Sequence, residues 1–157
     1  MALIKSIMKT NLHVARPWDS VLTVSKKMSE NNEGAILVVD NDRAVGIFSE
    51  RDLLKRVIAQ EKNPLHVNID EVMTENPATV NADTHVKDCV KLIKDKGIRH
   101  LPVEDNDGKL VGIVSTRDFL QFIVNGLEHL IDEADFKAKL EEGEDPYEHL
   151  GGGYSTE

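Results

Sequence analysis

Two short segments of the chain carry the same set of polar side chains: Ser49-Glu50-Arg51-Asp52 and Ser115-Thr116-Arg117-Asp118. Each follows a Gly-Ile-x stretch and precedes an apolar run, so we expect a strand that ends at the serine and a helix that begins there. The free N–H groups of a helix start can bind phosphate, and a short carboxylate can accept hydrogen bonds from two adjacent ribose hydroxyls. These residue types therefore fit a nucleotide site.

The same residues also have a purely structural interpretation. A serine three residues before an acidic residue can form a capping box, which stabilises a helix start without any ligand. The arginines favour a ligand slightly, because a cation in the first helical turn opposes the helix dipole by roughly 0.3 to 1 kcal/mol. A compensating anion would offset this cost, but a neighbouring carboxylate could supply it. The motif alone leaves both interpretations open.

The two segments belong to a longer internal repeat. Over the first forty or so residues the matching residue lies about 65 positions later, so that Met8 aligns with Met73 and Val38 with Val103. Gly108 is a one-residue insertion in a turn, after which Asp52 aligns with Asp118. Duplicated units tolerate such insertions at turns. The period therefore indicates two copies of one structural unit.

Both copies predict the same order of elements. Apolar residues at helical spacing predict a helix that Asp19 or Ser20 caps and another that Asp83 or Thr84 caps. Two buried strands joined by an Asp-Asn-Asp turn follow, and a second helix begins at each serine. The fold class is therefore α/β (α+β), with two β-α-β-β-α repeats that pack with pseudo-twofold symmetry, because one such small repeat could not bury its apolar face alone.

The repeats divide the chain into four predicted parts. Residues 1–60 form the first repeat, 61–68 a linker that contains Pro64, and 69–126 the second repeat. Residues 127–157 form a C-terminal helix followed by an acidic tail, whose Gly151-Gly152-Gly153 run predicts partial disorder.

Composition and charge exclude several classes of function. The formal net charge is −9, but most of the acidic excess lies after Gly126, so the repeated body is nearly neutral and could hold an anionic ligand. The chain has no basic stripe with interleaved aromatics, which argues against nucleic acid. No apolar stretch is long enough to cross a membrane and no export leader is visible, so we expect a cytoplasmic protein. Cys89 should be a buried thiol, and no histidine spacing predicts a metal site.

Several motifs in their order resemble a tandem pair of CBS domains. They are Met-Thr-x-Asn-Pro-Ala-Thr-Val from Met73, Gly-Ile-Arg-His-Leu-Pro-Val from Gly97 and Gly-Ile-Val-Ser-Thr-Arg-Asp from Gly112. This regulatory module is named after cystathionine β-synthase and is often called a Bateman module. The resemblance covers Ile4 to about Asn125, and its strength lies in the whole set, since each motif alone is weak.

The resemblance implies a binding module. Related pairs bind AMP, ADP or ATP, or in some cases S-adenosylmethionine, in clefts between the repeats, and commonly dimerise into a flat disk. Asp118 matches the family's ribose-binding aspartate, and Arg99 with His100 matches a basic pair that faces phosphates. The nucleotide-binding residues implied for the second repeat are Thr79, Val80, Ile98, Arg99, His100, Ile113, Ser115, Arg117 and Asp118.

The first repeat matches the same pattern less well. Glu33-Gly34-Ala35 stands where the second repeat has Ile98-Arg99-His100, and a carboxylate near a nucleotide phosphate costs affinity. We therefore favour the second site over the first, although Arg99 and His100 could instead form surface ion pairs at a strand start. The corresponding residues of the weaker site are His13, Val14, Glu33, Gly34, Ala35, Ile47, Ser49, Arg51 and Asp52.

The sequence thus predicts a regulatory, energy-sensing module that binds an adenine nucleotide and signals to a partner or through its homodimer. The alternative is a ligand-free dimerisation and protein-interaction scaffold that uses the repeats and the acidic tail. We expect no enzyme activity, no catalytic residues, no metal and no cofactor, because the motifs assemble neither an activated nucleophile nor an acid–base pair.

Overall fold

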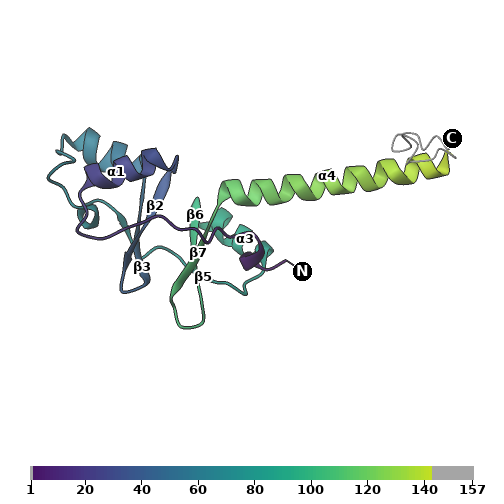
Figure 1. The fold of residues 1–157 in the computed structure, drawn as a ribbon, viewed down its shortest axis with the longest axis horizontal. Helices are drawn as coiled ribbons and strands as arrows, with labels where there is room; N and C mark the ends of the chain where they lie inside the picture. The colour runs from purple at the N-terminus through teal and green to yellow at the C-terminus, as the bar shows by residue number, and fades with distance from the viewer. Residues whose placement is uncertain (1, 143–157) are drawn as a thin grey trace, which may run out of the picture. The chain divides into compact units, whose positions relative to one another are not determined.

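Figure 1 shows the computed structural model, which describes residues 2–142. The Gly-rich end for which the sequence predicts disorder lies outside these described residues. The elements of the first half are η1 (Ile4–Ser6), β1 (Val14–Ala15), α1 (Val21–Glu30), β2 (Ala35–Asp40), β3 (Arg43–Ser49), α2 (Glu50–Asp52), the π-helical turn η2 (Leu53–Val57) and η3 (Ile58–Gln60). Those of the second half are η4 (Ile69–Glu71), β4 (Thr74–Glu75), β5 (Val80–Asn81), α3 (Val86–Lys96), β6 (His100–Glu104), β7 (Leu110–Ser115) and α4 (Thr116–Glu141).

The strands form two sheets, one for each predicted repeat. In the first sheet β1 lies parallel to β2, β2 pairs antiparallel with β3, and β4 pairs antiparallel with β3. In the second sheet β5 lies parallel to β6, which pairs antiparallel with β7. Both predicted hairpins are thus confirmed, as is the mixed α and β class. The first sheet differs from the predicted three strands because β4 of the second half joins it.

The opening segment of each repeat packs into the core of the other repeat. Ile4 is fully buried among Cys89, Leu101 and other residues of the second half. Ile69 and Val72 are buried among residues of the first half, which include Phe48. The repeated sequence unit and the packed unit are therefore offset from each other. This exchange ties the halves together, because neither core is complete without a segment of the other copy.

The glycines of the repeated motif allow this exchange. An added Cβ on Gly46 would collide with the side chain of Met73, and one on Gly112 would lie 2.6 Å from the Met8 sulfur. The Gly112 position also has the Lys9 carbonyl oxygen at 3.1 Å from such a Cβ. The methionine of each copy therefore packs directly against the glycine of the other copy, and a larger residue than glycine would overlap with it.

Helix α4 continues past the end predicted for the second repeat. The sequence predicts one helix after Ser115 and another after Gly126, but a single helix runs from Thr116 to Glu141 through that glycine. The chain divides into two compact units, with the boundary between Phe119 and Leu120. Between residues 2 and 142 there is no helix whose length and apolar character would allow it to span a bilayer.

Candidate functional site

In the second copy of the motif, Asp118 has one oxygen held by the helix cap and one that pairs with a lysine. Its Oδ2 accepts hydrogen bonds from the Ser115 backbone N–H and from the Ser115 hydroxyl, both at 2.7 Å. Its Oδ1 lies 3.3 Å from the ammonium nitrogen of Lys9, whose side chain is 62% exposed. Oδ2 therefore forms the helix cap that the structural interpretation predicts, while the partner of Oδ1 among the described residues 2–142 is an exposed lysine.

Two effects oppose each other on the Asp118 carboxyl. Burial by itself would raise its pKa, because burial disfavours the charged form. The hydrogen bonds from Ser115 and the positive charge of Lys9 outweigh burial, so the pKa of Asp118 lies below its ordinary value. Asp118 is therefore a carboxylate at neutral pH, the form that accepts hydrogen bonds from hydroxyl groups.

His100 lies beside this carboxylate and is the cross-strand partner of Ser115. Burial lowers its pKa, and the charge of Lys9 lowers it further, while Asp118 and Glu50 act in the opposite direction. Because the ordinary pKa of histidine is about 6.5, the imidazole is neutral at pH 7. His100 can therefore exchange hydrogen bonds with a ligand, but it is not a permanent cation for a phosphate.

In the first copy, Asp52 is held on both oxygens. Ser49 donates to its Oδ2 from the backbone at 2.9 Å and from the hydroxyl at 3.0 Å, as in the second copy. Its Oδ1, however, lies 3.3 Å from Nε of Arg56. That guanidinium is itself fixed, because it donates to the carbonyls of Val72 at 3.2 Å and of Met73 at 2.7 Å. The arginine thus occupies the position that an exposed lysine has beside Asp118.

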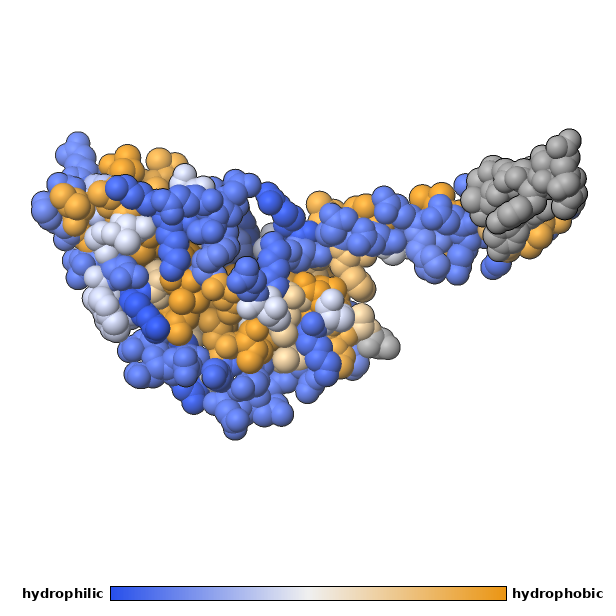
Figure 2. All heavy atoms as spheres, viewed as in Figure 1, coloured by the Kyte–Doolittle hydropathy of each residue, from blue (hydrophilic) through white to orange (hydrophobic). Residues whose placement is uncertain are grey.

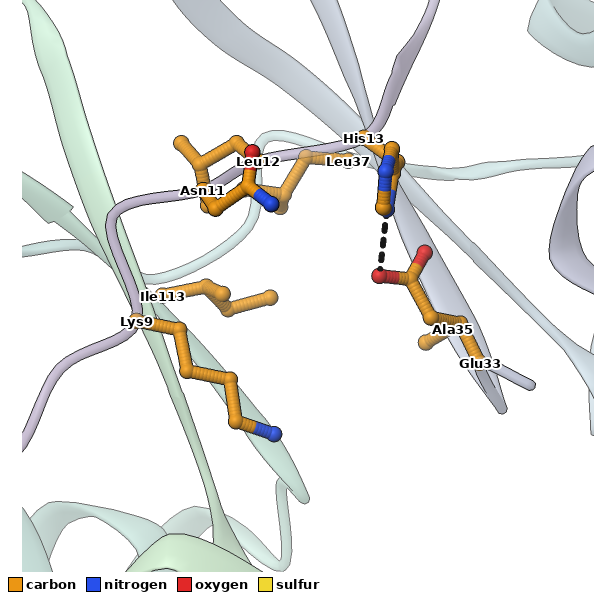
Figure 3. Close-up of a pocket in the computed structure, with 8 residues that line it drawn as sticks. All are labelled: Lys9, Asn11, Leu12, His13, Glu33, Ala35, Leu37 and Ile113. Carbon is orange, nitrogen blue, oxygen red and sulfur yellow. Dashed lines mark hydrogen bonds and ion pairs between the residues drawn. The ribbon is translucent and has the colours of Figure 1, made fainter. Parts of the chain in front are cut away.

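A small open pocket lies between the two sheets, as Figure 3 shows. His13, Glu33 and Ala35 reach it from the first half, and Ile113 faces them from β7. His13 Nδ1 lies 2.9 Å from Glu33 Oε1. Glu33, whose carboxylate makes the first-repeat site less favourable for a nucleotide, thus has a histidine as its partner. The remaining lining residues are Lys9, Asn11, Leu12 and Leu37.

The predicted residues of the second repeat fall into two groups. Ile113, Ser115 and His100 lie together across β6 and β7, and the Arg99 carbonyl accepts a hydrogen bond from the Thr116 N–H at 2.9 Å. Thr79 and Val80 lie on the other side of β6, where Val80 pairs with Val103 and the Thr79 hydroxyl donates to Glu104 at 3.1 Å. Ile98 packs against the second core, and Arg117 is exposed.

The predicted residues of the first repeat surround β2. Val14 pairs with Leu37 on one side of this strand and Ile47 pairs with Leu37 on the other. The Gly34 carbonyl accepts a hydrogen bond from the Glu50 N–H at 3.0 Å, and Arg51 is exposed. Only His13, Glu33 and Ala35 of the matched positions in this repeat line the pocket.

Sequence reasoning missed Lys9 and Arg56, the two cations that distinguish the aspartates. Neither belongs to a repeated pattern, since Lys9 aligns with Thr74 and Arg56 with Phe122. A mismatch between aligned copies next to a shared motif is the one signal in the sequence that could have identified them.

The profile of the CBS domain family matches residues 4–59 and 69–125. These matches cover most of the chain, so the protein belongs to the CBS domain family and carries two copies of the domain. The resemblance seen in the sequence is thereby confirmed.

Relatives and solved structures agree with this assignment. An uncharacterised protein of Methanopyrus kandleri is 42% identical over 106 residues, which are 67% of this chain and 54% of that protein. The chain thus spans about half the length of this relative. A putative signal-transduction protein with CBS domains from Burkholderia ambifaria has 31% identity and a TM-score of 0.74 over 79% of this chain and 95% of its own.

Two further solved structures contain ligands. The CBS domain pair of protein MJ0100, in complex with 5-methylthioadenosine and S-adenosyl-L-methionine, has 28% identity and a TM-score of 0.70 over 78% of this chain and 99% of its own. CBSX2 in complex with AMP has 25% identity and a TM-score of 0.70 over 80% of this chain and 98% of its own. Both sets of ligands contain adenosine or a close derivative of it.

Proposed function

We propose that this CBS domain pair is a regulatory module that binds an adenine nucleotide, AMP, ADP or ATP, between its two repeats. Occupancy of the site is passed to a partner protein or to the arrangement of a homodimer. The proposal is supported by the adenosine compounds bound to related pairs and by the polar groups around Asp118.

The observation that carries the proposal is that Oδ1 of Asp118 pairs with Lys9, whose side chain is exposed. Because Oδ2 serves the helix cap, Oδ1 can exchange Lys9 for a ribose hydroxyl without loss of the cap. The released ammonium group of Lys9 would then be free to pair with a phosphate. The equivalent exchange at Asp52 would displace Arg56 from a carboxylate and from two backbone carbonyls, which makes the first copy the poorer site.

The pocket supplies apolar surfaces for a base. Leu12, Ala35 and Ile113 are positioned around it, and the His13–Glu33 pair adds polar groups at its edge. Its volume of about 40 Å³ is far below the roughly 300 Å³ at which small-molecule sites begin. Binding therefore requires side chains to move, and Lys9, whose side chain is 62% exposed, has room to do so.

The proposed site combines parts of the two predicted sites. Ser115 and Asp118 come from the second repeat, whereas His13 and Ala35 come from the first. Thr79, Val80 and Ile98, which the resemblance assigns to the same site as Asp118, stay predictions, and none of them lines this pocket.

Isothermal titration with AMP, ADP, ATP and S-adenosylmethionine tests the proposal. Asp118→Asn should weaken binding by about 10- to 100-fold, because a hydrogen bond to a charged group is lost. Asp52→Asn is the matched control, since it changes the same capping box in the first copy, and should alter affinity by less than about 3-fold. Absence of binding at millimolar ligand would refute the proposal, as would equal losses in the two variants. Binding of S-adenosylmethionine alone would reject the nucleotide while retaining an adenosine site.

A scaffold remains the second candidate function. Exposed apolar side chains along α4 favour it, and Figure 2 shows such side chains among the hydrophilic ones of this helix.

A further inference from the structure

Helix α4 carries a continuous line of apolar residues beyond the first unit of the chain. Their spacing alternates between four and three residues, the spacing that keeps side chains on one face of a helix in a two-helix coiled coil. Leu120 is 61% exposed, Leu127 54% and Ile131 59%, so this face is open to solvent. We call the following residues the α4 seam: Leu120, Val124, Leu127, Ile131, Ala134 and Ala138.

We propose that the α4 seam binds the α4 seam of a second copy of this chain, as a parallel, in-register pair of helices. The inference is independent of the proposed nucleotide site, which lies in the other unit of the chain. It names a surface and an orientation, neither of which follows from membership of the family.

The residue types along the seam favour two parallel helices. The β-branched residues Val124 and Ile131 hold one set of core positions, and Leu120 and Leu127 hold the other. This distribution is the one that favours parallel two-stranded coiled coils over larger assemblies. Ala134 and Ala138 allow closer approach of the helices near the end of the seam.

The charges beside the seam distinguish the two orientations. In a parallel pair, Lys137 lies next to Glu142 of the second copy, which gives an attraction twice because the pair is symmetric. In an antiparallel pair, the flanking position that holds Glu128 and Asp135 faces the same position of the second copy. Acidic side chains then lie next to acidic side chains, and they repel each other. Charge complementarity therefore selects the parallel arrangement.

The helix also needs a partner to be stable. The unit that begins at Leu120 has β-branched residues and Gly126 within it, and glycine in a helix interior costs about 1 kcal/mol relative to alanine. Isolated helices are marginal even with better composition. A lipid surface is a poor alternative partner, because the polar faces carry Glu128, Asp132 and Glu133, whereas interfacial helices have lysine and arginine there.

Cysteine cross-linking of the full chain tests the orientation. Leu120→Cys and Ala134→Cys are made separately and oxidised with oxidised glutathione, which takes two electrons and two protons from the thiol pair as the disulfide forms. Cys89 does not compete, since it is buried and burial raises its pKa to about 11. Covalent dimers from both variants are expected. A covalent dimer from only one variant would overturn the parallel arrangement, and none from either would overturn the pairing.

A second pair of variants tests the seam itself. Leu127→Gln with Ile131→Gln removes two seam side chains, and we expect at least about 100-fold weaker self-association and loss of the Ala134→Cys cross-link. Phe122→Gln with Leu140→Gln is the control, because it removes similar apolar side chains from other faces of the helix. Sedimentation over a concentration series measures the self-association of the two double variants. A wild-type chain that stays monomeric, or a seam variant that still cross-links, would refute the proposal.

Discussion

The two copies of the Gly-Ile-x-Ser-x-Arg-Asp motif form the same helix cap but differ in what surrounds it. In both, the serine donates to Oδ2 of the aspartate from its backbone and its hydroxyl. Oδ1 of Asp52 meets Arg56, which two backbone carbonyls fix in place, while Oδ1 of Asp118 meets the exposed Lys9. The two copies therefore share the helix cap, and residues outside the motif give each aspartate a different cation as its partner.

The helices that follow the two caps differ as well. After Asp52 the chain makes a π-helical turn and then a 3-10 turn that ends at Gln60, whereas α4 continues regularly from Thr116 to Glu141. Arg56 lies within the π-helical turn and reaches both Asp52 and the Val72 carbonyl from there. Irregular helical turns often mark positions where a side chain has a specific role. Here the Arg56 side chain links Asp52 to the Val72 carbonyl.

The largest difference between the copies is expected at their glycines. Gly112→Ala should lower the free energy of unfolding by about 1 to 3 kcal/mol, because the new methyl group meets the Lys9 backbone as well as Met8. Gly46→Ala should cost less, since its three nearest contacts all belong to the Met73 side chain, which can rotate. Urea unfolding measures both values. Gly126→Ala is the control without a clash, since apart from its chain neighbours and the backbone of its own helical turns no described atom lies within 4 Å of the added Cβ. If Gly46→Ala lowered the free energy of unfolding as much as Gly112→Ala, the two methionine–glycine contacts would be equivalent.

A smaller difference is expected between the two cations. Arg56→Gln should destabilise the fold by about 1 kcal/mol, because it removes an ion pair with a largely buried carboxylate and two hydrogen bonds to carbonyls. Lys9→Gln should change stability by less than about 0.5 kcal/mol, since its ion pair is exposed on the lysine side. Chemical denaturation of the two variants at neutral pH makes the comparison. The interpretation of Arg56 as a fixed partner fails if its loss costs no more than that of Lys9.

The smallest expected effect is a dependence of stability on pH at the second copy. The folded state lowers the pKa of His100 through burial and Lys9, so it binds fewer protons than the unfolded chain at mildly acidic pH. The contribution of His100 to the free energy of unfolding is therefore complete above the ordinary histidine pKa of about 6.5, and it decreases as the pH falls below that value. Asp118, whose pKa is also lowered, adds a further loss below about pH 4.

Denaturant titrations at about pH 7.5 and pH 5.5 would measure this dependence. His100→Gln should reduce the loss between these two values, because glutamine does not titrate. The charged groups that act on His100 are Asp118, Lys9 and Glu50, and the comparison of the variant with the wild type isolates the contribution of this one histidine. An unchanged slope in the variant would assign the pH dependence to other groups.

Much of the local structure could be predicted because it depends on neighbours in the sequence. The hairpins of β2 with β3 and of β6 with β7 follow from apolar runs around Asp-Asn-Asp, and Asn41 and Asp42 adopt the positive φ angles that such turns need. Both Ser-to-Asp caps follow from a three-residue spacing. The continuity of α4 through Gly126 could not be predicted in the same way, because glycine is found more often just past the end of a helix than in its interior.

The sequence by itself determined the duplicated element order, the two helix caps and the family, because each depends on residue types at short, repeated spacing. Only the tertiary structure decided that Ile4 and Ile69 exchange cores and that His13 and Ile113 share a pocket. It also decided which cation stands beside each aspartate. Lys9 and Asp118 are more than a hundred residues apart in the sequence, and their charged atoms lie 3.3 Å apart in the fold. Neither local sequence pattern predicts this contact, because it depends on how the two repeats pack.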